Sequence, residues 1–498
     1  MFVSYEERYG LYCRKISALD LFKKRKISAV ENDKKRKISA VENDKNGKIS
    51  AVDLCNSYKI STFVAYYIFL SNMEEQIILQ VVADQRQEIE RMRPSAWVKR
   101  MEEQWFDLQS PLAQIVIGVR RSGKSVLCHK VLHEAKINYA FINFDDDRLA
   151  NIHIDDLNIV LTCLYRIYGN FEFLFLDEVQ NVDGWHLFVN RLLRQGVHLI
   201  VTGSNAKLLS AELATHLAGR YNEIRLFPFS FAEYCDANKI DTTSLTTQAL
   251  AFRQEGLLHY LQDGGFPELL HVRDKRGYVQ QLVNVIIHKD IRERYHIRLV
   301  AALERLADYL MDNFCQEVVR KNIATTCGIT SLRTIDNYIA YLRQAYLLLG
   351  LHKYSFKAKE RITQEKNYVI DVALLSNRNG VLSSENWGWR LENVVYIELL
   401  RRAAANFQDI FYYKHPKTHK EVDFVVCERS RVVELIQVCY ALSDMNTYDR
   451  ETSSLWLAAK QLHCSNLMLI VLEGEKKEIV QDDMTIHIMP AMEWLLQQ

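Results

Sequence analysis

The sequence predicts an α/β protein whose first folded part is built on a parallel β-sheet. Apolar runs at residues 115–117, 171–177 and 198–205 are rich in β-branched or aromatic residues, as buried strands are. Helical patterns separate these runs, and such alternation is typical of a parallel sheet with helices on both faces. The motif GVRRSGKS follows the first run and precedes a helical pattern, which is the context that a phosphate-binding loop requires.

Composition limits what else the chain can be. Its 498 residues are enough for about three domains. The ten cysteines are scattered and form no CxxC pair, so neither a disulfide scaffold nor a cysteine metal site is predicted. The apolar run at residues 63–70 is too short to span a bilayer. We therefore expect a cytoplasmic protein with no membrane partner.

Charge is unevenly distributed along the chain. Residues 1–72 carry 14 Lys and Arg against 8 Asp and Glu, a net charge of +6. Residues 73–498 carry 49 basic and 54 acidic residues. The bulk charge of this larger part does not indicate a nucleic-acid-binding protein, so any contact with DNA needs a local basic patch.

The motif at residues 118–126 is the predicted nucleotide-binding loop. Gly118 and Gly123 allow the backbone to curl so that its N–H groups point at phosphate oxygens. Lys124 can reach the β- and γ-phosphates of ATP, and Ser125 can offer its hydroxyl to Mg²⁺. The predicted contacts to ATP are Gly118, Val119, Arg120, Arg121, Ser122, Gly123, Lys124, Ser125 and Val126.

Acidic and polar residues follow the next two predicted strands. Asp177 ends the run FEFLFLD and is a predicted Mg²⁺ ligand together with Ser125. Glu178 is placed to orient or deprotonate the attacking water, so Lys124, Asp177 and Glu178 form the predicted catalytic set. After the third run, Thr202, Ser204 or Asn205 could sense the γ-phosphate; an ordinary strand-to-loop turn is the alternative.

Taken together, these motifs resemble one family. GVRRSGKS, FLFLDEVQNVDGW, VTGSNAKLLSAELATHLAGRY and LFPFSFAEY resemble the AAA-type (AAA+) P-loop ATPases of bacteria and archaea that carry a C-terminal domain of unknown function. GGFPELL, RLENVVYIELLRR and KEVDFVV extend the resemblance over most of residues 100–445. It implies an AAA+ core, then a winged helix, then a restriction-endonuclease-like domain. It also makes Arg220 a candidate arginine finger or sensor, with a structural ion pair as the alternative.

The middle of the chain, residues 236–345, is predicted to be mostly helical. A helix, a turn at Cys327 and Gly328, a second helix and a strand-like stretch follow one another, which is helix-turn-helix patterning with a wing. The second helix offers only Arg333 and Arg343 to DNA phosphates. Packing, or a role as a lid on the ATPase, is therefore an alternative to DNA binding.

The C-terminal part follows the order of the PD-(D/E)xK nuclease motif. Glu392 lies on a helix, Asp423 on a strand, and Gln437 and Cys439 on the next strand. In active members the acidic or amide side chains bind Mg²⁺, and a Lys two residues later positions water or stabilises negative charge. Cys439 occupies that position. We expect a degenerate nuclease-like domain kept for packing or DNA binding, with an active nuclease as the alternative, closed by two strands and a helix.

An internal repeat precedes all these motifs. Residues 23–44 contain KKRKISAVEND twice without a mismatch. Residues 42–53 approach a calcium loop, but position 1 is Glu, and other copies place Arg where that loop needs Gly. A charged helix with an eleven-residue stripe and a basic arm for nucleic acid are further interpretations. We favour a dispensable extension that arose by duplication, with the family-like chain starting at Met73.

The sequence thus predicts four parts: a basic extension (1–72), an AAA+ core (73–235), a helical lid and winged-helix region (236–375) and a nuclease-like domain (376–498). The predicted function is Mg²⁺-dependent ATP binding and hydrolysis by a DNA-associated factor. A nucleotide-switched regulator of protein partners and an active ATP-dependent nuclease are the alternatives. The sequence specifies no oligomeric state.

Overall fold

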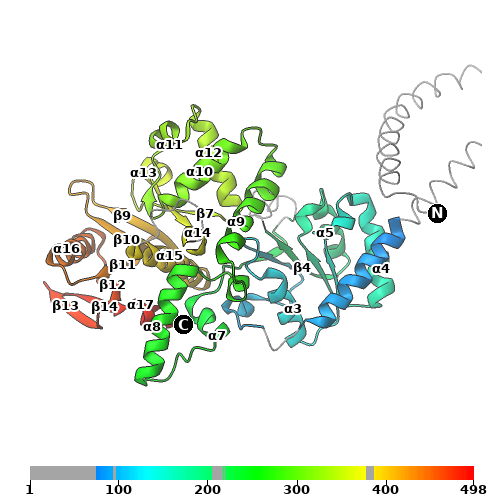
Figure 1. Cartoon of the computed structure of the whole chain (residues 1–498), viewed down its shortest axis with the longest axis horizontal. Coiled ribbons are helices and arrows are strands. Elements are labelled where there is room, and N and C mark those ends of the chain that lie inside the picture. Colours follow the sequence, from blue (N-terminus) through cyan, green and yellow to red (C-terminus); the bar gives the residue numbers. More distant parts are fainter. Residues whose placement is uncertain (1–73, 93–96, 205–216, 218, 377–385, 498) are drawn as a thin grey trace, which may run out of the picture. The chain divides into compact units, whose positions relative to one another are not determined.

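The fold is seen in a computed structural model that describes residues 74–92, 97–204, 217, 219–376 and 386–497. The repeat at residues 23–44, the calcium-loop pattern, Asn205 and the rest of the predicted extension therefore lie outside the described residues. A helix over residues 74–91 opens the described chain (Figure 1), and Glu74 and Glu75 lie in its first turn, where acidic residues are favourable. Among the helices that the structure describes, none has the length and apolar character of a bilayer crossing. The cytoplasmic location stays a prediction.

A five-stranded parallel sheet organises the first part of the chain, as predicted. Its strand order is β2-β3-β4-β1-β5, and every neighbouring pair is parallel. The strands are β1 (Ala113–Ile117), β2 (Tyr139–Asn143), β3 (Phe173–Asp177), β4 (His198–Gly203) and β5 (Tyr221–Arg225). Because side chains alternate between the faces of a strand, Val116 joins one buried cluster while Ile115 and Ile117 join another. Both faces are covered, which is why the central strands are continuous apolar runs.

Among the described residues, three α-helices connect strands β1 to β4: α3 (Lys124–Glu134), α4 (Leu157–Tyr168) and α5 (Trp185–Arg194). Helix α3 contributes Leu127 and Leu132 to the cluster on one face, whereas α4 and α5 contribute to the cluster on the other. Short helical turns occur beside these elements: η2 (Met101–Trp105), η3 (Asp147–Leu149), η4 (Ile154–Asp156) and η5 (Val179–Asn181). The carboxyl ends of all five strands meet at one edge of the sheet, where ligands bind in such folds.

The middle of the chain is mostly helical, as predicted. Its helices are α7 (Phe231–Ala237), α8 (Thr247–Asp263), η7 (Pro267–Leu270), α9 (Lys275–Val285), η8 (Ile286–Glu293), α10 (Val300–Asp312), α11 (Arg320–Cys327) and α12 (Leu332–Gln344). Side-chain caps explain several starts: the hydroxyl of Ser230 accepts from the Glu233 N–H, and that of Ser331 accepts from the Thr334 N–H. Element η8 is a π-helix, which continues α9 directly.

A small antiparallel sheet brackets helices α11 and α12 in the chain, with one strand before them and two after. Its strand order is β6-β8-β7, with β6 (Gln316–Glu317), β7 (Leu348–His352) and β8 (Glu365–Val369). Short helix α13 (Ala358–Thr363) lies between β7 and β8, and α14 (Ala373–Ser376) follows β8. Helix α11 ends at Gly328, whose φ of +66° is a left-handed conformation that glycine adopts without strain.

The C-terminal part has a six-stranded mixed sheet with the order β13-β14-β12-β11-β10-β9. Its elements are α15 (Trp387–Asn406), β9 (Gln408–Lys414), β10 (Glu421–Glu428), β11 (Arg431–Ala441), α16 (Met445–Leu462), β12 (Asn466–Glu473), β13 (Lys477–Gln481), β14 (Met484–Pro490) and α17 (Ala491–Leu496). The prediction of two closing strands was wrong, because three strands, β12, β13 and β14, follow α16. Strand β13 lies at the sheet edge and is almost wholly exposed, so its sequence lacks the apolar pattern of a buried strand.

One continuous buried cluster runs through residues 78–495. It includes Ile115 of β1, Leu306 of α10, Leu391 of α15 and Trp494 of α17. Packing therefore joins the three predicted parts that follow residue 73, and their boundaries at 235 and 375 stay predictions.

Candidate functional site

The loop between β1 and α3 has the backbone that its two glycines predict. Gly118 has a φ of +154°, and a Cβ atom there would collide with the carbonyl oxygen of Leu226. Gly123 has a φ of +94° and precedes the first turn of α3. The loop thus ends at the N-terminus of an eleven-residue helix, where backbone N–H groups and the helix dipole favour an anion.

Lys124 is held inside this loop. Only 4% of its surface is exposed, and its Nζ donates to the carbonyl oxygens of Gly118 (3.3 Å) and Val119 (3.2 Å). The same Nζ lies 3.7 Å from Oε1 of Glu178. The ammonium group therefore rests among weak acceptors of the loop and one carboxylate, at the position from which it would reach a phosphate.

Ser125 and Asp177 lie together at the carboxyl edge of the sheet. The Ser125 hydroxyl is 2.8 Å from Oδ2 and 3.0 Å from Oδ1 of Asp177. The Thr202 hydroxyl, at the end of β4, also donates to Asp177. Burial and the neighbouring charge of Glu178 raise the pKa of Asp177 to about 6. Such a buried carboxylate gains from a cation, and its oxygen and the Ser125 hydroxyl are ligands that Mg²⁺ accepts.

Glu178 occupies an unusual backbone position. Its φ of +50° and ψ of +41° are left-handed, and its N–H donates to the Thr202 hydroxyl over 3.1 Å. Non-glycine residues seldom adopt this conformation, and it turns the side chain away from the line of β3. Burial opposes ionisation of Glu178, but the charge of Lys124 and a hydrogen bond from Gln180 outweigh it and hold its pKa below the ordinary value.

Gln180 is a member of this site that was not predicted from the sequence. Its amide nitrogen donates to Glu178 and, over 3.3 Å, to the Ser204 hydroxyl. It thus connects the end of β3 to the end of β4. The only sequence signal was its position two residues after Glu178.

Arg120 points from the loop to a distant helix. Its guanidinium makes two 3.2 Å hydrogen bonds to the carboxylate of Asp290, in η8, and a third to Asp145. Burial opposes its charge, but these carboxylates outweigh that effect and raise the pKa of Arg120. Lys289, beside Asp290, pairs with Asp145 over 2.6 Å. Arg120 is therefore a bridge between the loop and the helical part rather than a free phosphate ligand.

The other predicted residues of the loop have varied surroundings. Arg121 pairs with Glu268 over 2.7 Å, and Ser122 and Val119 are buried. Val126 is 41% exposed on α3.

The structure does not bring Arg220 to the loop. It precedes β5, whose first residue pairs with the first residue of β1, whereas the loop follows the last residue of β1. Four residue steps of strand, about 13 Å, separate the two edges of the sheet. Arg220 therefore cannot act as a sensor in the nucleotide site of its own chain.

The four residues of the nuclease-like motif lie around a second site. A cavity of about 1000 Å³ is lined by Glu392, Asp423, Gln437 and Cys439. Burial raises the pKa of the Cys439 thiol to about 12, so this side chain is neutral at pH 7. Lys366, from β8, also lines the cavity, and the sequence did not point to it. Among the described residues, no group of three or more His, Cys, Asp or Glu side chains is arranged to hold a metal ion.

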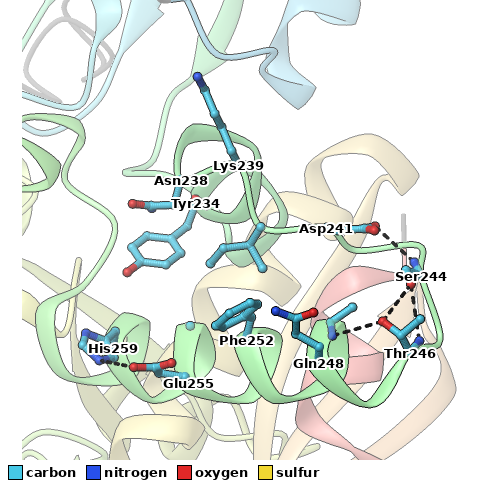
Figure 2. A pocket seen from close by; sticks show the side chains of 13 residues that line it. Tyr234, Asn238, Lys239, Asp241, Ser244, Thr246, Gln248, Phe252, Glu255 and His259 are labelled. Carbon is cyan, nitrogen blue, oxygen red and sulfur yellow. Dashed lines mark hydrogen bonds and ion pairs between the residues drawn. The ribbon is translucent and has the colours of Figure 1, made fainter.

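A further cavity, of about 640 Å³, lies between α7 and α8 (Figure 2). Tyr234, Lys239, Phe252 and His259 are among the residues that line it, and Figure 2 shows the pairing of His259 with Glu255. It contains none of the predicted site residues.

Comparisons with known proteins agree with this architecture. The AAA domain family matches residues 110–235, and two domains of unknown function, DUF8612 and DUF4143, match residues 254–385 and 387–494. Among solved structures, the Walker-type ATPase PABY2304 of Pyrococcus abyssi is 16% identical, covers 56% of this chain and 95% of its own, and has a TM-score of 0.36. The RuvB Holliday junction branch migration motor of Thermotoga maritima is 17% identical over 48% and 81%, with a TM-score of 0.26. These two likenesses are too distant to carry an argument.

Two proteins are similar over most of their length. "Uncharacterized protein MJ1544" of Methanocaldococcus jannaschii is 35% identical over 401 residues, which are 77% of this chain and 88% of that protein. An "Uncharacterized protein" of Haemophilus influenzae is 30% identical over 401 residues, 77% of this chain and 94% of that protein. The chain therefore belongs to the family of these two proteins, and its residues 110–235 are an AAA-type P-loop ATPase domain.

Proposed function

We propose that this protein binds and hydrolyses ATP in a Mg²⁺-dependent reaction at the loop between β1 and α3. The observation that carries the proposal is the convergence of Lys124, Ser125, Asp177 and Glu178 within hydrogen-bond or ion-pair distance at the carboxyl edge of one parallel sheet. Loop N–H groups, a cation, a hydroxyl and two carboxylates are the groups that phosphoryl transfer to water requires.

The residues present fit a Mg²⁺ ion. The hydroxyl of Ser125 and the carboxylate of Asp177 are both oxygen ligands, and they already face one another. When bound, the ion would neutralise charge on the phosphate oxygens. Thr202 would hold the Asp177 carboxylate in place, because its hydroxyl donates to that group.

Lys124 and Glu178 would have the two other roles, in phosphate binding and in water activation. Lys124 would exchange two carbonyl oxygens of the loop for phosphate oxygens, which are stronger acceptors for an ammonium group. That movement would remove its pairing with Glu178. Glu178 would keep its hydrogen bond from Gln180, and its carboxylate would be free of Lys124 and able to accept a hydrogen bond or a proton from the attacking water.

Nucleotide binding by the full chain tests this proposal. A fluorescent ATP analogue with Mg²⁺ should bind the wild-type protein and lose affinity by about a hundredfold in Lys124→Ala, since a charge-assisted contact to phosphate is removed. Lys99→Ala, which removes an exposed lysine, is the matched control and should bind as wild type does. Equal affinity in wild type and Lys124→Ala would contradict the assignment of the site.

The DNA-associated role is a proposal that a different observation supports. Helices α11 and α12 followed by strands β7 and β8 have the order of a winged helix, and the β7–β8 connection carries the exposed cations Lys357, Lys359 and Arg361. Arg333 is exposed on α12, whereas the guanidinium of Arg343 pairs with Glu365 over 2.7 Å. Lys357 pairs with Glu360 over 3.1 Å, which partly compensates its charge, but Lys359 and Arg361 add two more exposed cations to the wing, against Arg333 on the second helix. A role as a nucleotide-switched regulator of protein partners remains the second candidate.

For the C-terminal part, we propose a degenerate restriction-endonuclease-like domain. The neutral, buried thiol of Cys439 cannot supply the charge that a lysine gives at the same place in the motif. Active cleavage is the alternative. That alternative predicts that the purified protein nicks duplex DNA in Mg²⁺ and that Asp423→Ala abolishes the nicking.

A further inference from the structure

A buried lysine lies among the carboxylates of the nuclease-like site. Lys366 is on β8, in the small sheet that precedes this part of the chain, and only 4% of its surface is exposed. Glu392 comes from α15, and Glu421 and Asp423 come from β10. Three elements that are distant in sequence thus bring one ammonium group and three carboxylates together.

The distances show that Lys366 is the common partner of these carboxylates. Its Nζ lies 3.1 Å from Glu392 Oε1, 2.6 Å from Glu421 Oε1 and 3.6 Å from Asp423 Oδ1. Burial alone would lower the pKa of Lys366, but the carboxylates around it outweigh burial and hold that pKa well above its usual value. The side chain is therefore charged at neutral pH.

The other polar side-chain atoms of Asp423 and Gln437 already have hydrogen-bond partners within the protein. The Gln437 amide accepts from the Asp423 N–H (3.2 Å) and donates to Glu451 (2.7 Å), so both of its ends are engaged. The second oxygen of Asp423 accepts from the Val438 N–H over 3.0 Å. Arg450 donates to Glu451 at 2.6 and 2.9 Å.

The Tyr368 hydroxyl is a second donor to the carboxylate of Glu392. It donates to Oε1 of Glu392 over 2.7 Å, the oxygen that also accepts from Lys366. Tyr368 and Lys366 lie on the same strand, so β8 supplies two donors to one carboxylate.

A nuclease of this type needs a divalent cation between its acidic residues. Mg²⁺ requires oxygen atoms at about 2.0–2.1 Å in octahedral geometry. The space between Glu392 and Asp423 is taken by Nζ of Lys366, and a divalent ion added beside this ammonium group would be repelled by it. The residues present therefore do not fit a bound Mg²⁺ ion.

We propose that the ammonium group of Lys366 takes the place of the divalent cation, so that the nuclease-like site binds no metal ion. The carboxylates are kept because they bind the lysine of β8, and they thereby fasten the C-terminal sheet to the small sheet before it. The proposal is independent of ATP hydrolysis. It rests on the nuclease-like interpretation only for the expectation that such a site would hold a metal.

Mn²⁺ binding by the full chain, measured without nucleotide by electron paramagnetic resonance, tests the proposal. All proteins carry Asp177→Asn, which removes the predicted metal position at the nucleotide site. The otherwise unchanged protein should bind no Mn²⁺ at the nuclease-like site. Lys366→Met, which keeps the length of the side chain but not its charge, should gain one Mn²⁺ site, because the repelling ammonium group is removed. Asp423→Asn added to Lys366→Met should abolish the gain.

Lys353→Met is the matched control, because Lys353 is also buried beside the small sheet and pairs with Glu360 over 3.2 Å. It should gain no site. Mn²⁺ bound by the parent protein and lost in Asp423→Asn would overturn the proposal, and this comparison does not depend on the folding of Lys366→Met. A folded Lys366→Met protein that gains no Mn²⁺ would overturn it too.

Discussion

At the scale of single residues, nucleotide binding and water activation are assigned to different side chains. Lys124 contacts the loop that would bind the phosphates, whereas Glu178 lies beyond it, at the end of β3. The Thr202 hydroxyl accepts from the backbone N–H of Glu178, and the Gln180 amide donates to its carboxylate, so both the backbone and the side chain of Glu178 have a polar partner. The left-handed backbone of Glu178 is strained, and such strain at a buried polar residue is typical of a functional position.

Glu178→Gln should therefore separate the two steps. The amide keeps the size of the side chain but cannot accept a proton, so ATP turnover should fall by about a hundredfold or more while nucleotide affinity changes little. Steady-state phosphate release and analogue binding measure the two effects. Glu172→Gln, an exposed change just before β3, should alter neither. A parallel loss of affinity and turnover in Glu178→Gln would argue against a role in water activation.

Asp177 gives a pH-dependent prediction. Its pKa of about 6 in the folded protein is above the value of about 3.9 for an unfolded chain, so the folded state favours the protonated form. The stabilisation from this proton is present below about pH 4 and is lost as the pH rises through 6. Asp177→Asn should remove this dependence. The melting temperature of Asp177→Asn minus that of wild type, both measured without nucleotide, should therefore increase from pH 4 to pH 7. A difference that is constant with pH would show that Asp177 is ionised throughout.

At the scale of elements, the β7–β8 connection is the part that decides between DNA and other partners. Lys357 and Lys359 flank α13's first residue and are exposed. The sequence pattern drew attention to the second helix instead, because helix-turn-helix proteins read DNA with it. That expectation did not foresee that Arg343 is committed to Glu365, a residue 22 positions later.

A double charge reversal in this connection tests the DNA-associated role. Lys357→Glu/Lys359→Glu should weaken binding to duplex DNA and reduce the slope of log K against log salt by about 2, because each phosphate contact contributes about 0.9. Lys476→Glu/Lys477→Glu makes the same charge change on exposed residues beside and in β13 and should alter the slope much less. Equal effects of the two double variants would indicate a loss of overall electrostatic attraction to DNA and not the loss of contacts at the β7–β8 connection. No DNA affinity in the wild type would favour the protein-partner candidate.

At the scale of the whole molecule, buried arginines join the nucleotide-binding loop to the C-terminal part. Arg100 donates to the carbonyl oxygens of Ser122 (3.3 Å), in the loop, and Phe227 (2.7 Å). Arg401, on α15, donates to the carbonyl oxygen of Pro228, the residue after Phe227, and also to Glu398. The segment at 226–230 is thus held from both sides, and it also packs beneath Gly118.

Loss of one of these arginines should destabilise the whole protein. Arg401→Met removes the donor to the carbonyl oxygen of Pro228 and one of the two arginine partners of Glu398, which keeps its 3.0 Å pairing with Arg402. The cost should be about 1–3 kcal/mol, since a buried acceptor loses its hydrogen bond. Calorimetry should show a clearly lower melting temperature. Arg431→Met, an exposed change at the start of β11, should not. An unchanged melting temperature in Arg401→Met would mean that the two parts are not joined through this contact.

The sequence predicted what local patterns determine. The loop, Asp177 and Glu178 follow from motifs of a few residues in a strand–loop–helix context, and the parallel sheet follows from the alternation of strands and helices. The partners of Arg120 and of the nuclease-like carboxylates could not be predicted. Asp290 is 170 residues from Arg120, and Lys366 is 57 residues before Asp423, so only the folded chain brings them together.

The central claim, ATP hydrolysis at the loop between β1 and α3, is tested most directly by phosphate release from ATP by the full chain. Turnover should occur in Mg²⁺, be lost with EDTA and fall to background in Lys124→Ala, while Lys99→Ala should keep the wild-type rate. Duplex DNA in the same assay should raise the rate if the protein is DNA-associated. Turnover that persists in Lys124→Ala, or is absent from a wild-type protein that binds ATP and Mg²⁺, would contradict the account.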